Sequence, residues 1–413
     1  MKLKFTLFYC LILTCGFITS SFASEDNLPA PFKGHNANSK YVINYMDYDA
    51  ILRTSVLTMG KSTRARAKKK SATLGTRLRS NINKLTALEG NRFFFESYKD
   101  EEYRQLITKI HESLESLPTT VALKEFSKDE QLAYWLNLYN VTMLDELNKI
   151  YPKRKLKDLY DDDSFLYDEI LEVAGIKLSL NDIQYKILAE KYKHDPLIIY
   201  GLYQGIIGSP NIRNRAYTGK NVYDELEANA NDFINSNRGT YGNDKKAFRV
   251  SSLYARNEIY FPKFKEDLTK HLLTYLEGYT RYQLENSKKI KTNIKDWNIT
   301  DIYGSERSFG GGVATNDAAL LDPYGSPEVT GTVRHFDGDT LTFRATGARP
   351  GGDAGNAGFH NASSISMKKI TGQQGRFTAE QIKLLHQLND LRLENMGIVT
   401  ITDLTEEVDA EQN

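Results

Sequence analysis

The stretch EQLAYWLNLYNVTML, residues 130–144, belongs to the strongest helix signal in the chain. Ser127 and Glu130 form the S-x-x-E pattern of a capping box, and Pro152 limits the helix at its other end. Large side chains recur at helical spacing and are expected in the core: Trp135, Leu136, Tyr139, Met143 and Leu147. The pattern therefore predicts a helix that packs these side chains into the core.

Two amides interrupt the apolar surface of that helix. Asn137 and Asn140 lie three residues apart, so they share one side of it. Buried amides need hydrogen-bond partners. We expect Asn137 and Asn140 to act either as structural braces, which is the favoured interpretation, or as residues that support a binding cleft.

Other elements follow from periodicity and capping residues. Residues 197–203 fit either a buried strand or a short helix. The remaining elements expected are a helix over 41–59, a helix over 100–117 that Asp100 caps and Pro118 ends, a strand over 175–178, a helix from Ser179 to about Tyr192, a helix from Asn221 to about Ile234, a strand over 248–250, and a helix from Pro262 to Tyr279. This order predicts a helix-rich α+β fold with a small mixed sheet.

The composition changes after residue 304, because 14 of the 28 glycines lie between Gly304 and Gly375. We expect loops there, with one hairpin over TVRHFDGDTLTF (332–343) that turns at Asp337-Gly338. The chain is therefore divided into a leader (1–23), a flexible lead-in (24–40), a main domain (41–304), a Gly-rich extension (305–376), a C-terminal helix (377–397) and a tail (398–413).

The first residues have the pattern of an export signal. Lys2 and Lys4 precede an apolar run from Phe5 to Ile18, and Ser21-Phe22-Ala23 fits a cleavage site. We expect a mature chain that begins at Ser24 and works in the periplasm or outside the cell, with no transmembrane span after cleavage. A lipid anchor at Cys15 is the alternative.

Charge and cysteine content narrow the class of protein. The leader holds two of the 54 Lys and Arg residues and no acid, so the mature chain has 52 basic and 53 acidic residues, or a net charge of −1. A nucleic-acid partner is not expected from this balance. Both cysteines, Cys10 and Cys15, lie in the leader, so no thiol nucleophile is expected in the mature chain. The seven histidines show no metal-ligand spacing, and no metal or cofactor is expected.

Four segments together resemble a known family. These are EQLAYWLNLYNVTML (130–144), GIKLSLNDIQYKIL (175–188), DPLIIYGLYQGIIGSPNI (195–212) and KDWNITD (295–301). They are similar, in this order, to segments of the bacterial domain of unknown function 547 family, over roughly residues 41–304. The resemblance implies a cleft of the papain or transglutaminase kind, with the 197–212 segment at its rim.

The positions that the family uses for chemistry are substituted in this chain. The resemblance implies cysteines at Gln204 and Ser209, histidines at Tyr185 and Ile199, and a glutamate at Gln184. A catalytically degenerate, hydrolase-like envelope protein is therefore expected, which binds a peptide, a glycan or a protein partner. The candidate cleft residues are Tyr185, Gln204, Ser209, Asn137 and Asn140. The alternative is an active hydrolase in which Ser209 is the nucleophile and His194 its base.

Overall fold

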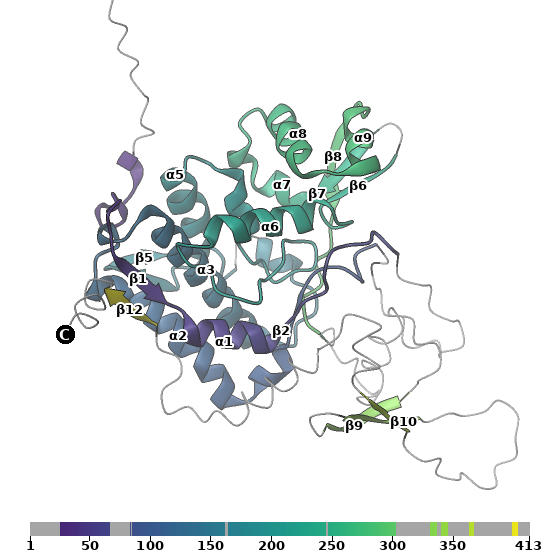
Figure 1. The fold of residues 1–413 in the computed structure, drawn as a ribbon, viewed down its shortest axis with the longest axis horizontal. Helices are drawn as coiled ribbons and strands as arrows, with labels where there is room; N and C mark the ends of the chain where they lie inside the picture. The colour runs from purple at the N-terminus through teal and green to yellow at the C-terminus, as the bar shows by residue number, and fades with distance from the viewer. Residues whose placement is uncertain are drawn as a thin grey trace, which may run out of the picture.

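A long buried helix lies at the centre of the fold (Figure 1). The computed structural model describes residues 25–66, 83, 85–161, 164–244, 247–302, 331–336, 340–345, 363–366 and 399–403. In α3 (Lys128–Ile150), every residue from Glu130 to Asp145 is buried. The Ser127 side chain accepts a hydrogen bond from the Glu130 amide, as predicted. The Glu130 carboxylate does not complete the capping box, because it accepts hydrogen bonds from the amides of Ile43 and Gly219 instead.

The helix α2 (Glu101–Thr120) packs along α3 and differs from its prediction at one end. Asp100 caps it as expected, by accepting a hydrogen bond from the Glu102 amide. Pro118, however, lies inside the helix and does not end it. A proline removes one amide donor, which would leave the Leu114 carbonyl without its helical partner. The Tyr134 hydroxyl of α3 donates a hydrogen bond to that carbonyl at 3.0 Å, so the helix continues past the proline.

The segment expected as a flexible lead-in is instead packed onto the domain. It holds two short turns, η1 (Glu25–Asn27) and η2 (Ala30–Phe32). The Phe32 ring is buried and meets Trp135 edge-on, with 5.0 Å between ring centroids. The buried Lys191 ammonium donates hydrogen bonds to the carbonyls of Phe32 at 2.6 Å and Gly34 at 3.0 Å. These contacts are tertiary, which explains why the local composition suggested flexibility.

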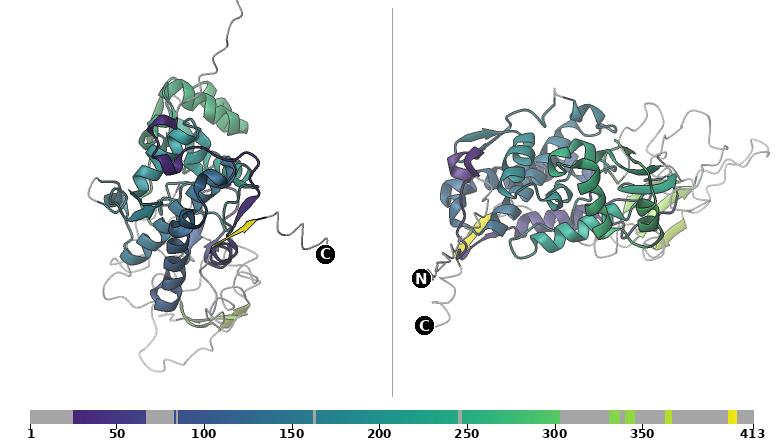
Figure 2. Two further views of the ribbon diagram at one scale, coloured as in Figure 1. Left: turned by 90° about the vertical axis from the view of Figure 1, so that its left-hand side faces the viewer. Right: turned by 90° about the horizontal axis from the view of Figure 1, so that it is seen from above.

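The prediction of a single helix over 41–59 is wrong. The chain forms β1 (Tyr41–Asn44), α1 (Met46–Ser55) and β2 (Val56–Leu57), and Asn44 marks the break by accepting a hydrogen bond from the Met46 amide. β1 pairs antiparallel with β12 (Thr400–Asp403), and the two strands lie side by side in the ribbon diagrams (Figures 1 and 2). Part of the expected C-terminal tail is thus a strand of the domain.

A small mixed sheet forms away from α3, as predicted. β7 (Ala247–Ser251) pairs antiparallel with β6 (Thr240–Asp244) and parallel with β8 (Ile290–Ile294). The crossover from β7 to β8 holds α7 (Ser252–Arg256), α8 (Phe264–Tyr275) and α9 (Gly278–Glu285). The expected single helix from Pro262 to Tyr279 is therefore two helices, because the backbone is extended at Leu276 and Glu277, between α8 and α9.

The remaining elements connect these parts. α6 (Val222–Ile234) begins after Asn221, whose side chain does not cap it but accepts a hydrogen bond from the Thr218 amide. The other elements are β3 (Arg92–Phe93), η3 (Phe95–Lys99), η4 (Leu123–Glu125), η5 (Lys157–Tyr160), β4 (Leu171–Val173), β5 (Ile176–Leu178), α4 (Leu180–Asp182), the π-helical η6 (Ile183–Leu188), α5 (Ala189–Lys191), η7 (Pro196–Tyr200) and η8 (Glu258–Tyr260).

In the C-terminal region, the structure describes short strands. β9 (Gly331–Phe336) pairs antiparallel with β10 (Thr340–Ala345), and β10 pairs with β11 (Ser363–Ser366). The turn expected at Asp337-Gly338 and the helix expected over 377–397 lie outside the described residues.

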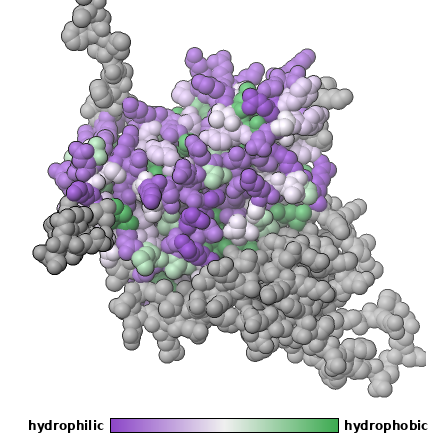
Figure 3. All heavy atoms as spheres, in the orientation of Figure 1, coloured by the Kyte–Doolittle hydropathy of each residue, from purple (hydrophilic) through white to green (hydrophobic). Residues whose placement is uncertain are grey.

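The fold is α+β, with many helices and several small sheets. The face seen in Figure 3 is mostly hydrophilic, with small apolar areas scattered over it. Among the described residues, no helix combines the length and the apolar character that a membrane crossing requires.

Candidate functional site

A pocket of about 270 Å³ lies on one side of α3. It is lined by Tyr139 of α3, by Asn181, Gln184 and Tyr185 of α4 and η6, by Gln204 of the bend after η7, by Arg256 of α7, and by Tyr160, Leu166 and Tyr167 from the 157–170 region. Two of the predicted cleft residues, Tyr185 and Gln204, therefore meet in one pocket although they are distant in the sequence.

Local sequence signals place the residues of the wall formed by α4 and η6. Ser179 and Asp182 form a complete capping box, in which each side chain bonds the backbone amide of the other. This fixes the start of the helix, so Gln184 and Tyr185 fall on its next turn. The Gln184 amide group donates to Asn257 at 2.6 Å, and the Tyr185 hydroxyl donates to the Arg256 carbonyl at 2.9 Å. Both contacts tie this wall to the end of α7.

Asn140 holds the bend that carries Gln204. Its amide nitrogen donates to the Gly201 carbonyl at 2.9 Å, and its amide oxygen accepts from the Tyr203 amide at 2.8 Å. Asn137 makes the same paired contact with the backbone of Tyr217, at 2.7 and 3.0 Å. Neither amide lines the pocket, so both act as braces, which was the favoured alternative from the sequence.

Glycine is needed in the bend itself. Gly205 has φ of +71°, and a Cβ atom added there would lie 2.6 Å from Leu147 Cδ1. A Cβ atom on Gly208 would lie 2.7 Å from the backbone nitrogen of Asp296. The bend therefore passes close to α3 and to the 296–299 segment, and these contacts leave no room for a side chain.

Arg256 is the one charged side chain among the described residues that line the pocket. Its guanidinium lies 4.8 Å from the ring centroid of Tyr160 and 5.1 Å from that of Trp297. Nη2 donates to Gln204 Oε1 at 2.7 Å, and Nη1 donates to Ser252 Oγ at 2.9 Å. No sequence motif marks this arginine, and its ring partners come from segments about 40 or more positions away along the chain.

Three tyrosine hydroxyls of the pocket, those of Tyr139, Tyr160 and Tyr185, are neutral at neutral pH. Burial is the main cause that raises the pKa of Tyr139 and Tyr160, and it outweighs the lowering effect of the Arg256 charge. The same balance raises the pKa of Tyr185 to about 12. These hydroxyls can therefore donate and accept hydrogen bonds, but they do not act as bases at neutral pH.

Ser209 and His194 do not meet. The Ser209 side chain is fully buried, and its hydroxyl donates to the carbonyl of Ile206 at 2.7 Å and more weakly to that of Pro210 at 3.4 Å. His194 lies edge-on to the Tyr260 ring, 6.2 Å between centroids. In the part of the chain that the structure describes, no hydrogen bond joins Ser209 to a histidine or a carboxylate. Ser209 is also absent from the pocket lining, so the expectation that it lies in the cleft is not met.

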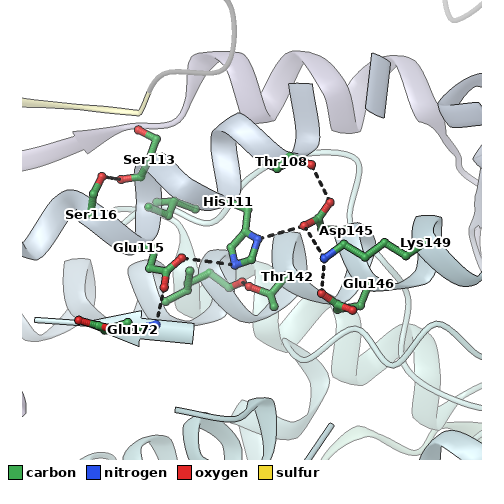
Figure 4. A network of polar contacts seen from close by, with 12 residues as sticks. Thr108, His111, Ser113, Glu115, Ser116, Thr142, Asp145, Glu146, Lys149 and Glu172 are labelled. Atoms are coloured by element: carbon green, nitrogen blue, oxygen red, sulfur yellow. Dashed lines mark hydrogen bonds and ion pairs between the residues drawn. The ribbon is translucent and has the colours of Figure 1, made fainter. Parts of the chain in front are cut away.

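A second polar cluster, which sequence analysis did not identify, lies between α2 and α3 (Figure 4). His111 Nδ1 is 3.2 Å from Asp145 Oδ2, and the Thr108 hydroxyl donates to the same carboxylate at 2.9 Å. Burial alone would raise the pKa of Asp145, but His111, Lys149 and Thr108 outweigh it and hold the pKa below its usual value. None of the drawn contacts brings a free hydroxyl to the His111 ring, so the cluster acts as a strut between helices.

The described lining of the pocket limits its chemistry. It contains no cysteine, histidine, aspartate or glutamate, and it therefore offers neither a strong nucleophile nor a base at neutral pH. The described residues also include no group of three or more His, Cys, Asp or Glu side chains with the geometry of a metal site. What the lining does offer is aromatic faces, amides, hydroxyls and one guanidinium.

Comparison with known families matches residues 123–234 to the family described as "Protein of unknown function, DUF547". No curated protein and no solved structure matches the chain. The matched range contains three of the four resembling segments and every lining residue of the pocket except Arg256.

Proposed function

Because residues 123–234 match the model of the DUF547 family, we propose that the pocket beside α3 is a ligand-binding site and that this chain works by binding rather than by hydrolysis. One observation carries the proposal. Gln184, Tyr185 and Gln204 gather in a single pocket with Arg256, and the described lining has hydrogen-bonding groups without a nucleophile or a base. Such a lining fits a site that holds a molecule without changing it.

The same three positions are those at which the family resemblance implies a glutamate, a histidine and a cysteine. Their convergence suggests that the cysteine position relevant to a cleft is 204 and not 209. In this chain, amide and phenol groups stand at all three positions, and none of them moves a proton readily at neutral pH. A catalytically degenerate site that has kept its pocket explains why these three positions converge and why none of them carries a catalytic group.

The competing proposal is a hydrolase that uses Ser209. It has little support, because the Ser209 hydroxyl is sealed in the interior and already donates to a backbone carbonyl. A nucleophile must reach its substrate and must have a base within hydrogen-bond distance.

The proposal also includes the location of the protein and the chemical class of its partner. Residues 1–23, which lie outside the described residues, have the sequence pattern of an export signal, and this pattern supports the proposal of an envelope or secreted protein. We propose a peptide, a glycan or an envelope protein as the partner, since these are the molecules such a compartment offers. Tyrosine faces and amides suit either peptide or sugar groups.

The test is a thermal-shift screen of short acetylated peptides and methyl glycosides against the wild type and two tryptophan variants. Asn181→Trp places an indole in the pocket lining, while Lys177→Trp adds the same indole at an exposed position of β5 that does not line the pocket. A ligand at tenfold its dissociation constant stabilises the folded state by about 1.4 kcal/mol, which shifts the melting temperature measurably.

We expect at least one peptide or glycoside to raise the melting temperature of the wild type and of Lys177→Trp, but not of Asn181→Trp. Stabilisation that persists in Asn181→Trp would place the binding elsewhere. Turnover of an ester or amide substrate that disappears in Ser209→Ala would replace the binding proposal with the hydrolase.

A further inference from the structure

The guanidinium of Arg256 is held in one orientation before any ligand arrives. The rings of Tyr160 and Trp297 lie against it, and its two terminal nitrogens each donate one hydrogen bond, to Gln204 and to Ser252. An arginine fixed in this way loses little conformational freedom when it binds a ligand. The pocket therefore has a preorganised cationic group.

The charge of this guanidinium is not balanced within the described part of the chain. No carboxylate lies within 4 Å of Arg256 there, and no acidic residue is among the described residues that line the pocket. Arg213 shows the contrast, because it lies 2.6 Å from Glu225 and 3.6 Å from Asp232. A half-buried cation without a counter-ion favours an anionic partner.

Donors remain for such a partner. A guanidinium has five N–H groups, and two of those of Arg256 are used. Gln204 uses its amide oxygen toward Arg256, and its amide nitrogen makes no hydrogen bond to any described residue. Two parallel N–H groups of an arginine guanidinium can bind the two oxygens of a carboxylate, and a neighbouring amide N–H adds a third donor.

From these observations we propose that the pocket recognises a carboxylate, which Arg256 and Gln204 bind, while Tyr139, Tyr167 and Leu166 contact the group that bears it. This inference rests on the proposed function and specifies its ligand class. A pocket of about 270 Å³ is small, so it takes the end of a molecule, such as a peptide C-terminus or an acidic sugar, rather than a long segment.

The experiment compares two pairs of probes that differ in one charge. N-acetyl-alanyl-alanine is measured against its C-terminal amide, and methyl glucuronide against methyl glucoside, by calorimetry at low salt. We expect each acid that binds to do so at least about tenfold more tightly than its neutral partner, as a charge-assisted arginine contact provides. Preference for the dipeptide acid alone identifies a peptide terminus, and preference for the glucuronide alone identifies an acidic sugar.

Variants of Arg256 test the assignment. Arg256→Gln should remove the preference for acids, and Arg256→Lys should retain only part of it, because lysine keeps the charge but not the fork. Circular dichroism checks that each variant folds, and if Arg256→Gln does not fold, Arg256→Lys decides. Equal affinity for acid and neutral probes, or an undiminished preference in a folded variant, would overturn carboxylate recognition.

The two proposals fail in different ways. Neutral probes that bind as well as acids, and that lose binding in Asn181→Trp, would leave the ligand pocket standing and remove only its preference for a carboxylate. If none of the four probes binds, carboxylate recognition is rejected, and the wider peptide and glycoside screen decides whether the pocket binds ligands at all.

Discussion

His271 makes the stability of this fold depend on pH in a direction that the structure specifies. The side chain lies on α8, stacks on the Tyr200 ring with 5.7 Å between centroids, and has its Nε2 2.8 Å from the Tyr200 hydroxyl. Burial lowers the pKa of His271 from its ordinary value of 6.5 to about 4. Tyr200 ends η7, immediately before the bend that carries Gln204.

The sign and size of the effect follow from linkage. The unfolded chain binds a proton at His271 below about pH 6.5, whereas the folded chain resists it until about pH 4. The contribution to stability is therefore complete above pH 6.5 and is lost as the pH falls from 6.5 to 4. A gap of about 2.5 pH units, at about 1.36 kcal/mol for each, corresponds to at most about 3 kcal/mol.

The assay is urea unfolding at half-unit intervals from pH 4.5 to 7.5, followed by tryptophan fluorescence. His271→Phe keeps an aromatic ring against Tyr200 but cannot titrate, and the Tyr200 hydroxyl retains Tyr254 at 3.1 Å. We expect its loss of unfolding free energy between pH 6.5 and 4.5 to be smaller than that of the wild type. His35→Gln is the control, because His35 is exposed. Parallel curves for wild type and His271→Phe would refute the argument.

Three further predictions concern the bend and the leader. Asn140→Ala should lower the free energy of unfolding by about 2–4 kcal/mol, because it leaves the buried backbone groups of Gly201 and Tyr203 unpaired, and chemical denaturation checks this. Gly205→Ala should lower the free energy of unfolding by about 2–4 kcal/mol, because it combines a positive φ with a clash against Leu147. The control is Gly175→Ala, which has φ of +77° but open space around it and should lower the free energy of unfolding by only about 1–2 kcal/mol. Equal losses in the two variants would disprove the packing argument. Mass spectrometry of the exported protein should find Ser24 at its N-terminus and no reactive thiol, and a lipid-modified Cys15 would contradict the cleavage prediction.

The sequence predicted elements whose cause is local. The helix start predicted at Ser179 and the cap predicted at Asp100 each depend on residues three or fewer positions apart, and both are present in the structure. The break at Asn44 was missed because β1 exists only through its pairing with β12, more than 350 positions away. Pro118 was misjudged because the hydroxyl that replaces its missing amide comes from another helix.

The residues of the candidate site likewise include some that the sequence identified and some that it did not. Tyr185 and Gln204 were found from the family resemblance, and the braces Asn137 and Asn140 from their place on a buried helix. Ser209 was included because the family resemblance implies a cysteine at this position, but the bend that carries Ser209 is enclosed by neighbouring segments. Arg256 carries no local signal, and its importance depends on rings and amides that only the folded chain assembles.

The pairing of β1 with β12 has a practical consequence for anyone who shortens this chain. A version cut after Ile302 would retain the whole family match but would lose the strand that covers the outer edge of Tyr41–Asn44. Unpaired strand edges recruit strands from other molecules. Such a truncated protein is expected to associate with itself in solution, and adding back a peptide with the sequence of residues 399–403 should compete with that association.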